Sequence, residues 1–309
     1  MKESLAGSGV RPIASRLWLE QARAMRFLPL VAAALCSCSG DSPPPTKAPL
    51  SALIGPEAGV IRIAGTGALS PLVYALTAAW SHRAGSLRVV VEDSIGSGGG
   101  VRAAAVGAVD LGMISRVLTV EEQRFGLREV AIATDAVVMA AHPDVPISGL
   151  TSAELRALYA DELRTFSDGS PATVLLRDRG ESANGTLDRA VPGMAAAREM
   201  AYARGRMRVL YHDAAMVEAL VATPFAIGVI NLGEVAASGS ALKVLTLDGK
   251  RPSIATLADG TWPMTRPLAF VARGDRIARV LPLLDFIASD EGAAITRSAG
   301  YLPAPRSAP

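Results

Sequence analysis

The sequence predicts an α/β protein with two lobes, each a mixed sheet flanked by helices. β-rich and helix-like segments alternate along the chain, beginning with Val60–Ala64 and an amphipathic segment at 71–81. The β-prone run Val130–Ala141 is long enough to cross from one lobe to the other. A later β-prone run at 262–271 and the helical segment at 276–289 indicate that the chain then returns to the first lobe.

These crossings define the expected domain limits. We assign residues 59–140 plus 264–305 to a first α/β lobe and residues 141–263 to a second. A body of about 250 residues can bury a large core, and two lobes are a reasonable division at that size.

The first 58 residues stand outside this pattern. Residues 1–38 resemble a leader with a lipoprotein-type signal, in which Cys38 would carry the lipid; Met25 is an alternative start. The apolar part of this leader is too short to span a bilayer, which takes about 20 apolar residues. Residues 39–58 are rich in serine and proline and predict a flexible tether. We expect export to a periplasmic or cell-surface face with a lipid anchor, the alternative being a cleaved signal peptide with incidental cysteines.

Composition excludes several classes of function. The chain has 31 basic and 29 acidic side chains, a balance that argues against nucleic-acid binding. Both cysteines precede the folded body, so no intramolecular disulfide or cysteine metal site is expected there. His82, His142 and His212 are widely separated, so we expect no metal site, and no cofactor is predicted.

Three loops join a predicted strand to a predicted helix and are rich in glycine and hydroxyl residues. They are Gly65–Ser70, Gly96–Gly100 and Arg177–Thr186, and Ser115-Arg116 is a weaker fourth. Backbone N–H groups at a helix start lack intrahelical partners and carry the positive end of the helix dipole. One small anion could therefore contact all of these loops at once.

The Arg177 loop is the most complete of them. Its arginine can neutralise an oxyanion while backbone and side-chain groups wrap around it, and a helix is expected from Leu187 onward. The wrapping residues would be Ser182, Asn184, Gly185 and Thr186. The alternative is a capped strand-to-helix loop with a surface arginine.

Several stretches, taken in order, resemble the phosphate-type solute-binding proteins of ABC transporters. The stretches are Gly65–Leu72, Ser94–Arg102, Asp110–Gly112 with Ser115-Arg116, the Arg177 loop, Thr223–Val229, Trp262–Leu268 and Phe286–Gly292. The resemblance implies a two-lobed periplasmic-binding-protein fold of type II that works as a monomer without catalysis. Such a protein captures phosphate or a similar oxyanion and delivers it to a membrane permease.

The same resemblance implies a set of binding residues. They are Leu69, Ser70, Ser97, Arg177, Ser182, Gly185 and Thr186, with Asn184 competing for the role of Ser182. Ser115 and Arg116 stand where phosphate-specific members often carry an aspartate that accepts the proton of hydrogen phosphate. Sulfate therefore stays open as an alternative ligand.

Other functions are less well matched. A sensory or accessory anion-binding protein would have the same fold. A dinucleotide-binding oxidoreductase is suggested by Gly65–Ser70 with Glu92 or Asp93 after the next strand, but Ser70 replaces the third glycine of that fingerprint. A serine hydrolase is weaker still, because Gly180–Asn184 lacks the closing glycine of a nucleophile elbow.

Overall fold

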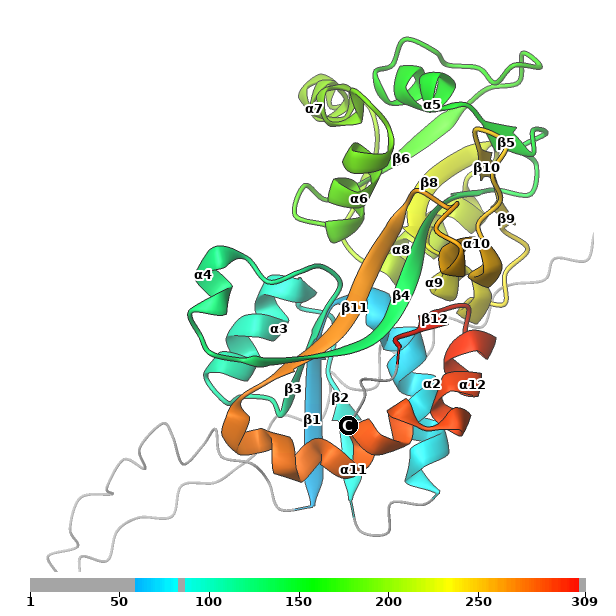
Figure 1. The fold of residues 1–309 in the computed structure, drawn as a ribbon. Helices are drawn as coiled ribbons and strands as arrows, with labels where there is room; N and C mark the ends of the chain where they lie inside the picture. The colour runs from blue at the N-terminus through cyan, green and yellow to red at the C-terminus, as the bar shows by residue number, and fades with distance from the viewer. Residues whose placement is uncertain (1–58, 83–86, 306–309) are drawn as a thin grey trace, which may run out of the picture. The chain divides into compact units, whose positions relative to one another are not determined.

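The computed structural model describes residues 59–82 and 87–305, which form a continuous mixed sheet covered by helices (Figure 1). Its strands are β1 (Val60–Gly65), β2 (Arg88–Val91), β3 (Leu111–Ile114), β4 (Arg128–Ala141), β6 (Thr173–Arg177), β7 (Val209–Leu210), β8 (Ala226–Asn231), β9 (Lys243–Val244), β11 (Thr265–Ala272) and β12 (Leu302–Pro303). They follow the order β2-β1-β3-β11-β4-β8-β6-β7, and β9 and β12 also pair with β4. A separate pair joins β5 (Gly149–Leu150) to β10 (Thr246–Leu247).

The helices cover both parts of this sheet. They are α2 (Ser70–Ser81), α3 (Gly96–Ala105), α4 (Val120–Gln123), α5 (Ser152–Tyr159), α6 (Ser182–Ala190), α7 (Met194–Arg204), α8 (Asp213–Ala222), α9 (Leu232–Ala237), α10 (Ile254–Ala258), α11 (Ile277–Ala288) and α12 (Asp290–Ser298). Short 3₁₀ turns lie at η2 (Gly67–Leu69) and η3 (Gly274–Arg276). None of the helices in the described ranges is long and apolar enough to cross a membrane.

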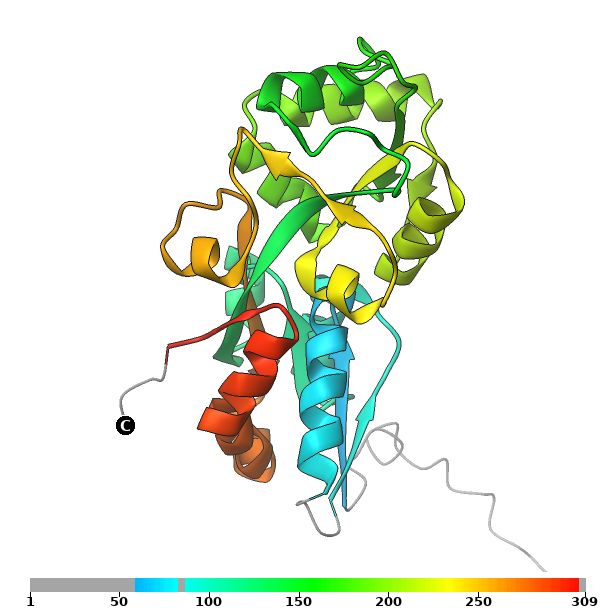
Figure 2. The same ribbon diagram turned by 90° about the vertical axis from the view of Figure 1, so that its right-hand side faces the viewer.

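The first lobe is a three-layer unit with helices on both faces of its sheet. Alternate residues of β1 point to opposite faces, so Ile63 packs with α2 and α11 while Ala64 packs with α3. Figure 2 shows α2 and α12 side by side, and they contact each other on that first face. Because β1, β2 and β3 are parallel, their carboxyl ends and the helices that follow meet at one edge of the sheet.

One long strand, β4, runs through both lobes. The first half of β4 pairs with β11, and its second half pairs with β8, so a single strand belongs to both parts of the sheet (Figure 1). β11 lies between β3 and β4 and is antiparallel to both. The run at 130–141, which the sequence predicted to cross between lobes, makes up most of β4.

The second lobe has a core of its own. Its buried members all come from the contiguous stretch Ala136–Met264, with β6, β8, α5, α7 and α8 as main contributors. α5 begins at a capping box: the N–H of Glu154 donates to Thr151 Oγ1, and the N–H of Thr151 donates to Glu154 Oε2. This two-lobed arrangement of mixed sheets and helices confirms the fold class predicted from the sequence.

One expectation about the first lobe was wrong. The sequence predicted that Gly96–Gly100 is a loop, but these residues form the first turns of α3. Glycine is a poor helix former in isolation, and here close packing outweighs that preference. A Cβ on Gly100 would lie 2.8 Å from Met113 O and 2.9 Å from the Cα of Gly65, so only glycine lets α3 lie this close to β1 and β3. The leader and tether expected at 1–58 lie outside the described residues.

Candidate functional site

Hydroxyl side chains gather where β1, β2 and β3 end. Thr66 follows β1, Ser97 lies in the first turn of α3, and Ser115 follows β3. Ser115 Oγ is 3.0 Å from Thr66 Oγ1 and 3.3 Å from Ser97 Oγ. The N–H of Ser115 donates to Ser97 Oγ at 3.1 Å. Three separate strand ends of the first lobe thus place their polar groups within one small volume.

The second lobe adds a fourth hydroxyl to this group. Ser182, at the start of α6, places its Oγ 2.8 Å from Ser115 Oγ. Arg266 on β11 donates from Nη1 to the same Ser182 oxygen at 2.9 Å. We call Thr66, Ser97, Ser115 and Ser182 the hydroxyl cluster. Polar side chains from the two lobes meet directly in this cluster.

An alternating chain of acids and bases runs behind the hydroxyl cluster. Its members are Asp135 on β4, Arg266 on β11, Glu181, Arg177 at the end of β6, and Asp213 at the start of α8. Successive members are 2.9, 3.4, 3.0 and 3.1 Å apart at their closest atoms. We call these five residues the ion-pair chain. The two arginine side chains are only 1% and 2% exposed, so both charges depend on these partners.

The acids of the ion-pair chain have unequal pKa values. Burial raises the pKa of Asp135 to about 7, although Arg266 partly offsets that effect. Burial also raises the pKa of Asp213. Burial acts against ionisation of Glu181 too, but Arg177 and Arg266 outweigh it and hold the pKa of Glu181 below its ordinary value. Glu181 is therefore the member that keeps its negative charge most firmly.

A cavity of about 540 Å³ opens beside the hydroxyl cluster. Its lining comes from Thr66, Ser94, Ile95, Gly96, Ser97, Gly98, Gly99, Arg102, Arg116, Asp178, Gly180, Glu181, Ser182, Tyr211 and His212. Both lobes contribute to this wall, and it is rich in hydroxyl groups and backbone at helix starts. Such a wall can hold an oxyanion through hydrogen bonds with little net charge of its own.

Among the residues predicted to bind ligand, Ser97, Arg116 and Ser182 line this cavity. Ser115 is buried at the centre of the hydroxyl cluster. Arg116 is held by Glu122 at 2.6 and 2.8 Å, and this hydrogen bonding lowers the pKa of Glu122 to about 2. Arg177 does not line the cavity and is buried against Glu181.

The remaining predicted residues lie away from the cavity wall. The side chain of Leu69 is fully buried in the first-lobe core, and Ser70 begins α2. α6 begins at Ser182, earlier than the helix expected from Leu187, and includes Asn184, Gly185 and Thr186. Asn184 Nδ2 donates to the carbonyl of Asp178 at 2.7 Å, so this amide is directed into its own loop. The lipidation predicted at Cys38 lies outside the described residues.

The sequence prediction gave no role to Thr66, Arg266, Asp135 or Asp213. Arg266 and Asp135 each interrupt an apolar β-prone run, and a charged residue within a buried strand usually has a partner. That signal was available for both. Nothing in the sequence, however, showed that β11 pairs with β4 and so brings the two residues together.

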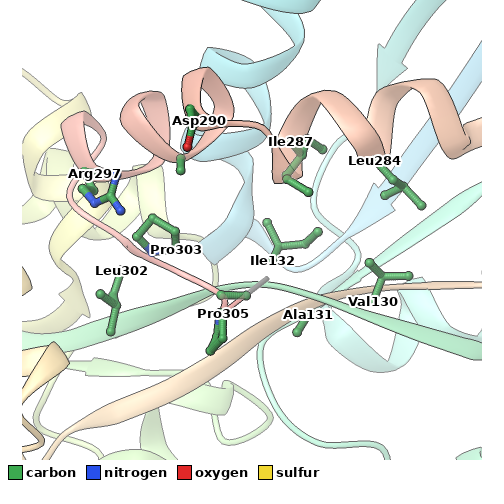
Figure 3. Close-up of a pocket in the computed structure, with 13 residues that line it drawn as sticks. Val130, Ala131, Ile132, Leu284, Ile287, Asp290, Arg297, Leu302, Pro303 and Pro305 are labelled. Atoms are coloured by element: carbon green, nitrogen blue, oxygen red, sulfur yellow. The ribbon is translucent and has the colours of Figure 1, made fainter. Parts of the chain in front are cut away.

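Another cavity, of about 590 Å³, lies against the first lobe between β4, α11, α12 and β12 (Figure 3). Apolar side chains such as Val130, Ile132 and Leu284 form much of its wall, with Asp290 and Arg297 on α12. It contains none of the hydroxyl cluster. Within the described ranges, no group of three histidine, cysteine, aspartate or glutamate side chains could hold a metal ion. The cavity beside the hydroxyl cluster is therefore the candidate binding site.

The chain is similar to known proteins over most of its length. The chain is 23% identical over 250 residues to the phosphate-binding protein PstS of Borreliella burgdorferi, covering 79% of this chain and 89% of that protein. It is 23% identical over 291 residues to PstS of Bacillus subtilis, covering 89% of this chain and 90% of that protein.

The fold also matches a solved structure. It is the crystal structure of a putative phosphate ABC transporter substrate-binding protein with bound phosphate from Clostridium perfringens. That chain matches with a TM-score of 0.71 and 22% identity, over 80% of this chain and 100% of that one. A family model described as a PBP superfamily domain matches residues 51–291. Because that match spans most of the sequence, this chain belongs to the PBP superfamily.

Proposed function

We propose that this chain is an extracytoplasmic solute-binding protein that captures an inorganic oxyanion, phosphate first among them, between its two lobes. It then delivers the anion to the permease of an ABC transporter. One observation carries the proposal: Ser97 and Ser115 of the first lobe meet Ser182 of the second, with Arg266 donating to the same group. The named relatives are phosphate-binding proteins, and the matched Clostridium perfringens structure contains phosphate.

The physical basis is a set of mostly neutral donors beside the cavity. Hydroxyl groups, the N–H groups at the start of α6 and one buried arginine can replace the hydration shell of a small anion. An anion that contacts both lobes binds the closed arrangement better than an open one and so shifts the population toward it. Closure around the ligand is what presents a loaded protein to a permease. We assign no catalytic step to this cleft.

The experiment is titration calorimetry of the protein, first freed of bound anion by unfolding in urea and refolding. Phosphate, sulfate and NAD are the ligands, and Ser97→Ala and Ser182→Ala are the variants. Losing one hydrogen bond to a charged ligand costs about 1.5–3 kcal/mol, so each variant should bind phosphate roughly 10- to 150-fold more weakly. Ser238→Ala, an exposed serine after α9, is the matched control and should bind as the wild type does.

Three results would count against the proposal. Wild-type affinity for phosphate in both cluster variants would show that the anion binds elsewhere. Binding of sulfate but not phosphate would move the protein to another ligand. A response to NAD alone would favour the dinucleotide alternative.

We also propose that the protein is exported as a monomer and held to the membrane by a lipid on Cys38. The support is the apolar leader followed by the Leu35–Cys38 segment. Cys38→Ser should move the protein from the membrane fraction to the soluble extracytoplasmic fraction. An unchanged membrane fraction in that variant would disprove the anchor while leaving the binding function untouched.

A further inference from the structure

The donors expected of an anion site already converge on a side chain of the protein itself. Glu181 Oε2 accepts from Arg177 Nη2 at 3.0 Å. Glu181 Oε1 accepts from Ser182 Oγ at 3.0 Å, and from Arg266 Nη1 and the N–H of Ala183 at 3.4 Å. Two guanidinium groups, one hydroxyl and one N–H at a helix start thus hold a single carboxylate. The same kinds of donor hold bound oxyanions in other proteins.

The carboxylate of Glu181 lies on the cavity side of Arg177. Its side chain is 19% exposed and lines the cavity, whereas Arg177 is 1% exposed and does not. Arg177 keeps two buried nitrogens, Nε and Nη1, without a hydrogen-bond partner among the described residues. An external anion in the cavity can therefore accept the hydrogen bond of Arg177 Nη2 only if the carboxylate of Glu181 moves aside.

The charges of the ion-pair chain lead to the same conclusion. Arg177 and Arg266 are matched by three carboxylates, those of Asp135, Glu181 and Asp213. An anion entering beside them meets no uncompensated positive charge, and burying one there is unfavourable. Withdrawal of Glu181 leaves both arginines with an open side toward the cavity.

We propose that Glu181 is a tethered competitor of the ligand. Its carboxylate occupies the donors of Arg177, Arg266 and Ser182, and it rotates toward solvent when an external oxyanion takes its place. The inference rests on the proposed function, because it concerns the same cleft and the same class of ligand. The ligand must then outcompete a carboxylate, so the site rejects simple carboxylates and chloride and accepts an anion with more charge and more acceptor oxygens, such as phosphate.

The test compares Glu181→Ala and Glu181→Gln with Glu199→Ala. Glu199 lies on α7, outside the cavity wall, and pairs with Arg179 at the surface, where both side chains are more than half exposed. Calorimetry should show Glu181→Ala binding phosphate and sulfate each about tenfold or more tightly than the wild type does. Formate should raise the Tm of Glu181→Ala and leave that of the wild type unchanged, because it replaces the missing carboxylate. Glu199→Ala should match the wild type in both measurements.

The outcomes separate this inference from the function on which it rests. Suppose that Glu181→Ala folds, binds phosphate no more tightly than the wild type, and shows no change in Tm with formate. This result would disprove the role of Glu181 as a competitor and leave phosphate binding intact. If the wild type does not bind phosphate but Glu181→Ala binds both phosphate and formate, Glu181 is a competitor and the proposed function is wrong. If neither the wild type nor any variant binds any of these anions, both the competitor role of Glu181 and the proposed function are wrong. If Glu181→Ala does not fold, the isosteric Glu181→Gln decides by the same affinities for phosphate and sulfate.

Discussion

Replacing Arg177 with methionine removes the cation that contacts both Glu181 and Asp213. Its Nη2 atom lies 3.0 Å from the first carboxylate and 3.1 Å from the second. Methionine keeps much of the side-chain volume, so the main change is two buried acids that lose their shared partner. Breaking a buried ion pair in this way costs about 3–5 kcal/mol. At about 2–4 °C per kcal/mol for a body of this size, the Tm should fall by roughly 6–20 °C.

Urea unfolding followed by circular dichroism measures the free energy, and differential scanning calorimetry measures the Tm. Arg179→Met is the control, because Arg179 lies two residues away and pairs with Glu199 at 2.5 Å, with both side chains more than half exposed. An exposed pair contributes about 1 kcal/mol or less, so this variant should stay close to the wild type. Equal losses in the two variants, or a loss below about 1 kcal/mol for Arg177→Met, would refute the view that Arg177 is the charge partner of both acids.

Three further predictions concern other parts of the molecule. Burial and the nearby Asp213 raise the pKa of Glu234 from 4.5 to about 7. The folded state therefore binds this proton more tightly than the unfolded state does, and the free energy of unfolding declines as pH rises from about 4.5 to 7. Glu234→Gln should flatten that decline in urea titrations at about pH 5 and pH 8. Gly100→Ala should destabilise the protein by about 1–3 kcal/mol in thermal unfolding, because its Cβ would meet Met113 O at 2.8 Å. Tyr301→Phe should cost about 1–3 kcal/mol in urea unfolding, because it removes a buried hydroxyl that bonds Ala68 and Asn231.

Local signals in the sequence predicted most of the elements. The Thr151–Glu154 box sets the start of α5 because its two hydrogen bonds join residues three apart in the chain. The Ser-Pro pair at 70–71 marks the start of α2 for a similarly local reason. The strand-to-helix junctions after β2 and β6 were located from the sequence, and Ser97 and Ser182 just beyond them line the same cavity.

Features that depend on distant parts of the chain could not be predicted in the same way. The place of Gly100 in α3 depends on its packing against Gly65 and Met113, which no local propensity reports. The partnership of Asp135 with Arg266 depends on β11 pairing with β4. The burial of Arg177 against Glu181 depends on where α6 begins, and the sequence placed that start too late.

The position of β11 also bears on how the chain is made. This strand completes the first-lobe sheet between β3 and β4, yet it is synthesised after the whole second-lobe core. The stretch 136–264 can pack as soon as it emerges, whereas the edge of β3 that faces away from β1 has no partner until residues 265–272 are made. Long-range strand pairing of this kind is slow, and it exposes unpaired strand edges in the meantime. Truncation before Thr265 leaves β3 and β4 without the strand that pairs with both, so the nascent chain needs residues 265–272 to cover two edges that would otherwise favour aggregation.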